Sequence, residues 1–344
     1  MARLLLQALD LAGYETTVVS DFRSFSREPA PEALAALEEK AATIRATLLR
    51  QFALTGPPDF WLTYHPFYKS PDLLGPSLTE ALEIPYATVE ASHAPKRNRD
   101  DWQAWQALAE RSLRLGEAHF CLTQRDRLGL ARFLNDETRL ISLPPFLDTT
   151  LFEKSGSQRP AGKPLELVTV AMMRFGDKLQ SYEFLAKTLA AGIQAADWRL
   201  TVIGDGPARV AVETAFSQVD PTRLEWRGAI SASEVMAALR SADLYVWPGF
   251  GEAYGMAYLE AQAAGLPVLA LDTGGISEVV RNSETGILVP TAIPEEFARA
   301  LDNLMASRET IQEMGTAARR FVLGERGLDH AAAILKAGIE KVMQ

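Results

Sequence analysis

Hydrophobic positions follow two spacings that alternate along the chain. Short runs rich in β-branched and aromatic residues predict strands, and the longer stretches between them, with apolar residues three or four positions apart, predict helices. The predicted strands of the first half are Thr16–Ser20, Phe60–His65, Tyr86–Ala91, Ala118–Thr123 and Arg139–Leu143. Those of the second half are Leu165–Met173, Trp198–Gly204, Leu224–Gly228, Leu244–Trp247, Pro267–Leu271 and Gly286–Val289. Strands that alternate with helices are typical of α/β proteins with mainly parallel sheets.

A polar segment rich in glycine and proline, residues 149–164, interrupts this pattern and is predicted to be a linker. It separates a Rossmann-like domain at 1–148 from a second one at 165–327. Residues 328–344 form a last helix that we expect to pack back toward the first domain. Open α/β sheets bind ligands beyond the carboxyl ends of their strands, so the expected site is the cleft where the two domains face each other.

The first domain begins with a predicted helix instead of a strand. Ala2–Leu11 has helical spacing, and Gly13 stands where a helix-terminating glycine is common. A doubly wound domain normally starts with a strand that becomes central in its sheet, and losing it exposes two rows of backbone hydrogen-bonding groups. We therefore expect a first strand and its turn, roughly 20 residues, to precede Met1 in the whole protein. The alternative is a genuine start with a rearranged sheet.

Composition and charge narrow the class of protein. The chain has 344 residues, 47% of them hydrophobic, and 35 Lys and Arg stand against 44 Asp and Glu, a net charge of -9. Such a chain is globular, and its negative charge argues against binding nucleic acid by phosphate neutralisation. The single cysteine, Cys121, excludes an internal disulfide and a cysteine-based zinc site, and it favours a reducing, cytoplasmic compartment.

Membrane contact finds little support in the sequence. No run reaches the roughly 18 to 20 apolar residues of a membrane span, and the first residues lack a signal-peptide pattern. The basic cluster of Lys96, Arg97 and Arg99 contributes only about 1 kcal/mol per charge near anionic lipid. We therefore expect a solvated loop there.

The stretch Pro248–Pro290 holds the most informative chemistry. Glu252 precedes a predicted helix that opens near Gly255, and helix N-termini with nearby glycines present free N–H groups to an anion. Glu260 follows on a helix that is apolar nearly all round, where a carboxylate needs hydrogen-bond donors. The vicinal hydroxyls of a ribose would supply two donors; the alternative is a surface glutamate with a partner in solvent.

Two further features follow strands of the second half. Arg174 and Lys178 come after Leu165–Met173, and two cations at the carboxyl end of a strand suit a diphosphate, although a solvated pair is the alternative. The Gly204–Pro207 run ends another strand and predicts a tight strand-to-helix turn. It lacks the third glycine of a dinucleotide fingerprint, because Arg209 stands there, which disfavours an oxidoreductase.

The run from Pro248 to Pro290 resembles the donor-site signature of GT-B-fold glycosyltransferases of the group-1, family-4 type. The matching residues are Glu252, Glu260-Ala261, Gly265-Leu266-Pro267-Val268 and Gly274-Gly275-Ile276-Ser277-Glu278. Other landmarks of the family follow in order as Arg174, Lys178, Ile203–Pro207 and Arg227-Gly228. The resemblance covers residues 165–340 specifically and residues 1–148 more loosely.

This resemblance implies a fold of two Rossmann-like domains and a role for each matching residue. It implies that Arg174 and Lys178 hold the leaving diphosphate, that Glu252 contacts the donor sugar, and that Glu260 binds the ribose. The further donor-binding positions that it implies are Gly204, Gly206, Arg227, Ala253, Tyr254 and Gly255. The implied reaction moves a sugar from a nucleotide-diphosphate sugar to an unidentified acceptor and retains the anomeric configuration. It needs no metal or cofactor, because the leaving phosphate accepts the proton of the acceptor.

The chain departs from the family pattern at two places. Three residues separate Arg174 from Lys178, where the family has about four, which affects the role of the lysine most. The family often places a histidine at the end of a strand in the first domain; here Glu90 falls near that position and His93 lies three residues on. Either would contact the sugar or the acceptor, with a surface loop as the alternative for His93. His65, among aromatic neighbours, is a weaker candidate.

Other functions stay open at this point. A nucleotide-sugar epimerase of the same fold would need no acceptor. A non-catalytic nucleotide-sugar-binding protein would follow if the expected first strand, which carries the glycine-rich loop of the family, is required for activity. A phosphorylase is excluded because no lysine lies in a pyridoxal-binding motif.

Overall fold

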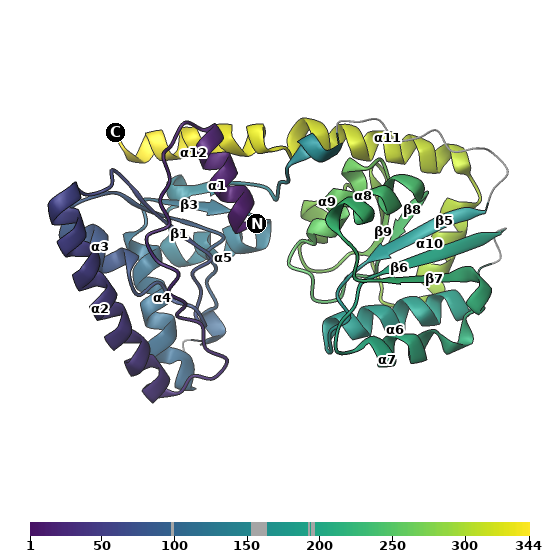
Figure 1. The fold of residues 1–344 in the computed structure, drawn as a ribbon, viewed down its shortest axis with the longest axis horizontal. Coiled ribbons are helices and arrows are strands. Elements are labelled where there is room, and N and C mark those ends of the chain that lie inside the picture. Colours follow the sequence, from purple (N-terminus) through teal and green to yellow (C-terminus); the bar gives the residue numbers. More distant parts are fainter. Residues whose placement is uncertain (98–99, 153–163, 192, 194–196) are drawn as a thin grey trace. The chain divides into compact units, whose positions relative to one another are not determined.

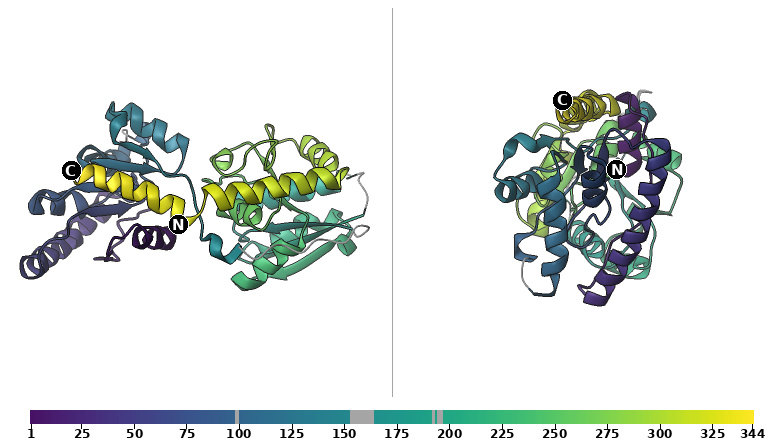
Figure 2. Two further views of the ribbon diagram at one scale, coloured as in Figure 1. Left: turned by 90° about the horizontal axis from the view of Figure 1, so that it is seen from above. Right: turned by 90° about the vertical axis from the view of Figure 1, so that its left-hand side faces the viewer.

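The computed structural model describes residues 1–97, 100–152, 164–191, 193 and 197–344. They form two compact units, each drawn in Figures 1 and 2. Unit 1 comprises Met1–Pro144 and Leu328–Gln344, and unit 2 comprises Pro145–Gly327. Most of the predicted linker, residues 153–163, lies outside the described residues.

Unit 2 is built on a sheet of six parallel strands. They are β5 (Leu165–Val170), β6 (Trp198–Ile203), β7 (Leu224–Gly228), β8 (Leu244–Val246), β9 (Val268–Leu271) and β10 (Gly286–Val289), in the order β10-β9-β8-β5-β6-β7. The chain runs outward from β5 to β7 and then returns to the other side of β5 to add β8. This reversal makes the gap between the carboxyl ends of β5 and β8 a topological switch point, where open α/β sheets bind ligands.

Helices cover both faces of this sheet (Figure 1). They are α6 (Asp177–Ala190), α7 (Arg209–Ala215), α8 (Ala232–Ser241), α9 (Met256–Ala263), α10 (Pro294–Met305) and α11 (Arg308–Glu325). The helices α7 and α10 pack against α6, and α11 packs against α9. Because both faces are covered, β8 and β9 are buried along their whole length and read as continuous apolar runs.

Unit 1 has a parallel sheet of four strands in sequential order. They are β1 (Trp61–Tyr64), β2 (Tyr86–Val89), β3 (Ala118–Cys121) and β4 (Leu140–Ser142). The helices are α2 (Pro31–Thr55), α3 (Gly75–Leu82), α4 (Gln103–Leu115) and α5 (Gln124–Leu134). Each strand is added on the same side of the one before, so right-handed crossovers place α3, α4 and α5 on one face.

The first and the last helix of the chain cover the other face of this sheet. The helix α1 (Ala2–Leu11) packs against α12 (Leu328–Val342), which also contacts β3. The helix α12 approaches β3 closely, because a Cβ atom built at Gly338 would lie 2.6 Å from the ring of Phe120. The last helix therefore packs within unit 1, as the sequence predicted.

Ten of the eleven predicted strands are present, but the prediction of a strand at Thr16–Ser20 is wrong. The described part of the chain has no strand before β1. Val18 is 67% exposed there, while Val19 packs against the core of unit 1. Thr16 and Thr17 are exposed as well, so the segment lacks the alternating burial of a strand, and among the described residues it pairs with no strand.

Among the helices that the structure describes, none combines the length and the apolar composition that crossing a bilayer requires.

His119 on β3 gives unit 1 a specific pH dependence. Its ring is fully buried, with Nδ1 2.7 Å from Oγ1 of Thr88, and burial, with the nearby charge of Arg139, lowers the pKa of His119 to about 4. In the unfolded chain histidine titrates near pH 6.5, so protons bind preferentially to the unfolded state between these values. The free energy of unfolding is therefore expected to fall by about 2 kcal/mol between pH 7 and pH 5 from this residue.

Urea unfolding at pH 7 and pH 5 measures this loss. The variant His119→Asn should lose most of the difference between the two pH values. The exposed His330 on α12 provides the matched control, and His330→Asn should keep the wild-type difference. An unchanged difference in His119→Asn would contradict the assignment.

Candidate functional site

The connection from β5 to α6 carries Arg174, and a glycine turn fixes its backbone. The N–H of Met173 donates to the carbonyl of Asp205 (2.9 Å), in the turn that follows β6. In that turn Gly204 has φ +146° and Gly206 has φ +153°, and a Cβ atom at Gly206 would lie 2.3 Å from the carbonyl oxygen of Met173. Both glycines therefore allow two backbone segments to meet, and they position the exposed side chain of Arg174.

The connection from β8 to α9 carries Glu252 to the other side of the switch point. The N–H of Phe250 donates to Oγ of Ser181 on α6 (3.0 Å), which ties this loop to the helix after β5. The N–H of Glu252 donates to the carbonyl of Gly249 (3.3 Å). Two elements that are distant in the sequence thereby hold Glu252 between them.

The carboxylate of Glu252 joins both sides of the switch point. Its Oε1 accepts from Nε1 of Trp247 (3.1 Å) and forms an ion pair with Lys178, in the first turn of α6. The Lys178 ammonium also lies 5.7 Å from the centre of the Trp247 ring. The side chains of Lys178 and Glu252 are 26% and 16% exposed, so the pair is partly shielded from water. The sequence singled out both charges but gave no sign that they pair, nor that Trp247 takes part.

The N-terminus of α9 follows directly. Gly255 caps it in the left-handed conformation, and no backbone carbonyl in the described chain accepts from the N–H groups of Met256 and Ala257. Ala253 is exposed and Tyr254 is buried beside them. Free N–H groups at a helix start carry partial positive charge and suit an anion.

Glu260 lies in the second turn of α9, as predicted. Its side chain is largely buried, and burial raises the pKa of this carboxyl above its usual range. Within the part of the chain that the structure describes, no side chain or backbone group donates to it. A carboxylate in this setting is costly unless a ligand supplies the donors.

Arg227 lies near the turn that follows β6, because the carbonyl of the next residue, Gly228, accepts from the N–H of Gly204 (2.8 Å). It lies on the edge strand β7, where Nε donates to Oε1 of Glu225 on the same face of the strand (2.8 Å). Both side chains are largely exposed. The Arg227 guanidinium is thus paired with a carboxylate of its own strand.

In unit 1 the structure separates the two candidates near the end of β2. His93 has a side chain only 7% exposed; its Nε2 lies 3.0 Å from Oε1 of Glu110, and its ring stacks on Phe133. Its contacts thus lie within unit 1. Glu90 directly follows β2, and its Oε2 is buried with no hydrogen-bond partner among the described residues.

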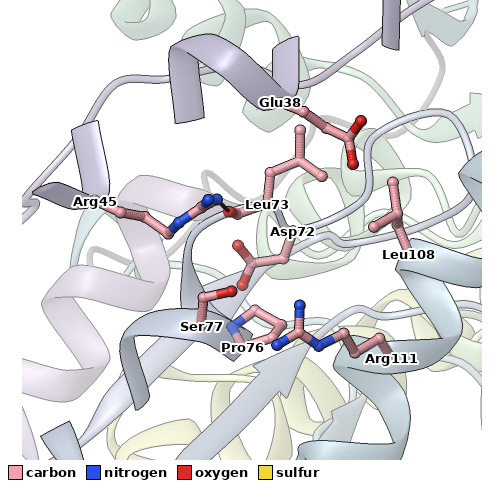
Figure 3. A pocket seen from close by; sticks show the side chains of 8 residues that line it. All are labelled: Glu38, Arg45, Asp72, Leu73, Pro76, Ser77, Leu108 and Arg111. Atoms are coloured by element: carbon pink, nitrogen blue, oxygen red, sulfur yellow. Dashed lines mark hydrogen bonds between the residues drawn. The ribbon is translucent and has the colours of Figure 1, made fainter. Parts of the chain in front are cut away.

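Figure 3 shows a small pocket in unit 1, lined by Glu38, Arg45, Asp72, Leu73, Pro76, Ser77, Leu108 and Arg111. Asp72 accepts from two backbone N–H groups at the start of α3 (2.8 Å each). Arg45 donates to a backbone carbonyl (2.7 Å), and Arg111 pairs with Glu80 (2.6 Å). These contacts stabilise the start of α3 and its surroundings, so the pocket is not a strong ligand site.

Within the described residues, no group of three or more His, Cys, Asp and Glu side chains is placed to hold a metal ion.

Gly274 is expected to be essential for the position of Glu252. It has φ +62°, and a Cβ atom there would lie 2.3 Å from the carbonyl oxygen of Glu252. Gly274→Ala should therefore lower the free energy of unfolding by about 1–3 kcal/mol, from backbone strain and overpacking. Gly324→Ala in α11, where no atom lies within 4 Å of the added carbon, is the control and should not destabilise the chain. Equal stability of the two variants in urea would contradict this.

Comparison with known protein families gives a match that lies within unit 2. Residues 165–307 match the protein family described as Glycosyl transferases group 1. A D-inositol 3-phosphate glycosyltransferase from Corynebacterium glutamicum (strain R) is 30% identical over 57% of this chain and 48% of its own length. The chain spans less than half the length of the curated relatives that it matches.

Solved structures share the fold. A glycosyltransferase from Rickettsia africae ESF-5 superposes with a TM-score of 0.75 at 14% identity, covering 99% of this chain and 94% of its own. Anabaena Alr3699/HepE, solved in complex with UDP, gives a TM-score of 0.68 at 13% identity over 87% of this chain and 82% of its own. The α/β fold with parallel sheets is therefore confirmed.

Proposed function

We propose that the chain is a retaining glycosyltransferase that moves a sugar from a nucleoside-diphosphate sugar to a hydroxyl group of an acceptor. The observation that carries the proposal is the convergence at the switch point of unit 2. Arg174 and Lys178 follow β5, while Glu252 and the N-terminus of α9 follow β8, and Glu260 lies one turn further along α9. The group 1 family match over residues 165–307 supports the same reading.

The diphosphate of the donor would bind between the two connections. The guanidinium of Arg174 offers two parallel N–H donors, and the free N–H groups of Met256 and Ala257 add the positive end of α9. Lys178 contributes a second cation that Glu252 already holds in place. The leaving group gains negative charge as the glycosidic bond breaks, so these groups stabilise the transition state more than the bound donor.

The two glutamates would orient the sugar and the nucleoside. Both hydrogen bonds to the Glu252 carboxylate go to Oε1, so Oε2 is able to accept from a sugar hydroxyl. Glu260, largely buried and without a donor, would accept from the two ribose hydroxyls. Such hydrogen bonds hold the donor in a reactive orientation, which by itself lowers the barrier by several kcal/mol.

The reaction proposed here uses no resident metal and no cofactor. The acceptor oxygen bonds to the anomeric carbon on the face that the diphosphate leaves, and a leaving phosphate oxygen takes the acceptor proton. The contribution of the protein is orientation and charge stabilisation. Backbone groups of Ala253–Gly255 would contact sugar and phosphate, and Glu90 in unit 1 is the residue proposed to face the acceptor. We place this activity in the cytoplasm.

Selective stabilisation by one nucleoside diphosphate is the expected result that tests the proposal. Thermal unfolding of the chain is measured with UDP, GDP and ADP and with their sugar conjugates. A ligand at 100 times its dissociation constant adds about 2.7 kcal/mol to the folded state. UDP is the first choice, because the HepE structure was solved as a UDP complex. No shift with any of these ligands would refute the proposal.

Glu260→Gln distinguishes ribose binding from nonspecific stabilisation. The amide has one acceptor oxygen and no charge, so two hydroxyls can no longer donate to a carboxylate, and the nucleotide is expected to bind about tenfold more weakly. The affinity for a 2′-deoxynucleotide should fall little when Glu260 is replaced by glutamine. Glu309→Gln, at an exposed position in the first turn of α11, is the matched control and should bind like the wild type.

A further inference from the structure

Trp247 directly follows β8 and is only 1% exposed. Its backbone N–H donates to the carbonyl of Leu269 on β9 (3.0 Å). Its carbonyl accepts from the hydroxyl of Tyr258 on α9 (3.1 Å). The neighbouring strand and the following helix therefore hold the backbone of Trp247 from two sides.

The indole ring of Trp247 is held as firmly as its backbone. It packs edge to face against the buried ring of Tyr182 on α6, with the two ring centres 4.7 Å apart and the planes at 72°. The hydroxyl of Tyr182 donates to the carbonyl of Ala171 (2.7 Å), just after β5. A large planar ring in a close-packed interior keeps one rotamer. The N–H at Nε1 therefore points in one direction.

This N–H and the ammonium of Lys178 act differently on the carboxylate of Glu252. Both donate to Oε1, the indole from 3.1 Å. The ammonium is a point charge on a flexible four-carbon stem with three rotatable donors, so it balances the charge without fixing the plane of the carboxylate. The indole has a single donor on a rigid ring. Trp247 is thus the residue that sets the direction of the carboxylate.

A fixed carboxylate makes Glu252 selective. The Glu252 side chain also lies against the backbone, because a Cβ atom built at Gly249 would lie 3.4 Å from its Cγ. With Oε1 occupied and the plane set, Oε2 accepts from a sugar hydroxyl only at a matching position. A hydrogen bond to a charged group changes affinity roughly 10- to 150-fold, so a sugar that lacks the hydroxyl at that position is disfavoured.

We infer that Trp247 is a positioning residue that fixes the Glu252 carboxylate for one hydroxyl of the donor sugar and so contributes to sugar selectivity. The inference rests on the proposed function, since it concerns the sugar part of the same donor. It separates two parts of that donor. Binding of the sugar depends on Trp247, whereas binding of the nucleoside diphosphate does not.

Calorimetric titration of the full chain with a nucleotide sugar and with its nucleoside diphosphate measures this separation. The probe pairs are UDP-glucose with UDP, GDP-mannose with GDP, and ADP-glucose with ADP, and the pair that stabilises the chain most is used. Trp247→Phe keeps an aromatic ring and removes the N–H. It should lower the affinity for the nucleotide sugar about tenfold and leave the affinity for the nucleoside diphosphate unchanged. An unchanged ratio of the two affinities overturns the inference.

Trp61→Phe in unit 1 is the matched control. Trp61 is also buried, and its Nε1 donates to Oγ1 of Thr63 (3.1 Å), so the variant loses the same kind of hydrogen bond and should keep both affinities. If Trp247→Phe does not fold, 3-benzothienylalanine at position 247 replaces the N–H by sulfur in a ring of similar size. A variant at position 247 that is less stable but keeps the wild-type ratio would mean that Trp247 is structural only.

The indole N–H signal of Trp247 in the NMR spectrum gives a second readout. Its absence from the spectrum of Trp247→Phe identifies it. The nucleotide sugar should move this signal further than the nucleoside diphosphate does, because only the former places a hydroxyl on Glu252. Equal movement with both ligands overturns the inference.

The inference and the proposed function fail in different ways. Binding of a nucleoside diphosphate with an unchanged affinity ratio in Trp247→Phe would refute the inference and leave the proposed function standing. No binding of any nucleoside diphosphate or nucleotide sugar would refute the proposed function, and the inference with it.

Discussion

Replacing Arg174 by alanine is expected to leave the chain folded and to remove most of its preference for nucleoside diphosphates over monophosphates. The side chain is exposed, and its backbone is held by the bond from Met173 to Asp205, which the substitution does not touch. A charge-assisted hydrogen bond contributes about 1.5–3 kcal/mol, so the affinity for the diphosphate should fall roughly 10- to 150-fold. The affinity for the monophosphate, which lacks the second phosphate, should fall much less in this variant.

Calorimetric titration with UDP and UMP, or with the pair of the base that stabilises the chain, measures this preference. Arg320→Ala, at an exposed arginine on α11, is the control and should keep both affinities. Thermal unfolding without ligand verifies that both variants are folded. An Arg174→Ala variant that retains the wild-type ratio of the two affinities would contradict a diphosphate at this position.

Lys178→Met is expected to have the largest effect on turnover. It removes a cation from the leaving diphosphate and also leaves the Glu252 carboxylate, 16% exposed, without its ion pair. Breaking a shielded pair from one side costs up to about 3–5 kcal/mol of stability. The loss of transition-state stabilisation should lower turnover roughly 100- to 1000-fold. Release of nucleoside diphosphate from the stabilising nucleotide sugar, with a panel of hydroxyl acceptors, measures turnover.

The double variant Lys178→Met with Glu252→Gln separates stability from chemistry. Removing both charges relieves the unpaired carboxylate, so urea unfolding should show a gain in stability relative to Lys178→Met alone. Turnover should stay as low as in the single variant, because neither group is restored. Recovery of turnover together with stability would mean that the pair is structural only. The exposed pair of Arg299 and Glu296 on α10 is the control, since Arg299→Ala should change neither quantity.

The sequence by itself determined most of the secondary structure and the fold class. Strand and helix patterns are local, because the spacing of apolar residues shows which face of an element is buried. The prediction gave α1, β7 and β10 with the bounds that the structure has. It also placed Glu252 before α9 and Glu260 within it, because glycines and an apolar helix around a carboxylate can be recognised in the sequence.

Only the tertiary structure decided which of the candidate residues meet. Lys178 and Glu252 are 74 positions apart, and they pair because β5 and β8 are neighbours in the sheet. His93 and Glu90 look equivalent in the sequence, yet His93 is paired with Glu110, whereas Oε2 of Glu90 has no hydrogen-bond partner within the described part of the chain. Thr16–Ser20 resembles a strand in its sequence, but among the described residues it pairs with no strand. The physical reason is the same in each case: burial of a face is encoded locally, whereas hydrogen bonds and ion pairs depend on which segments the fold places side by side.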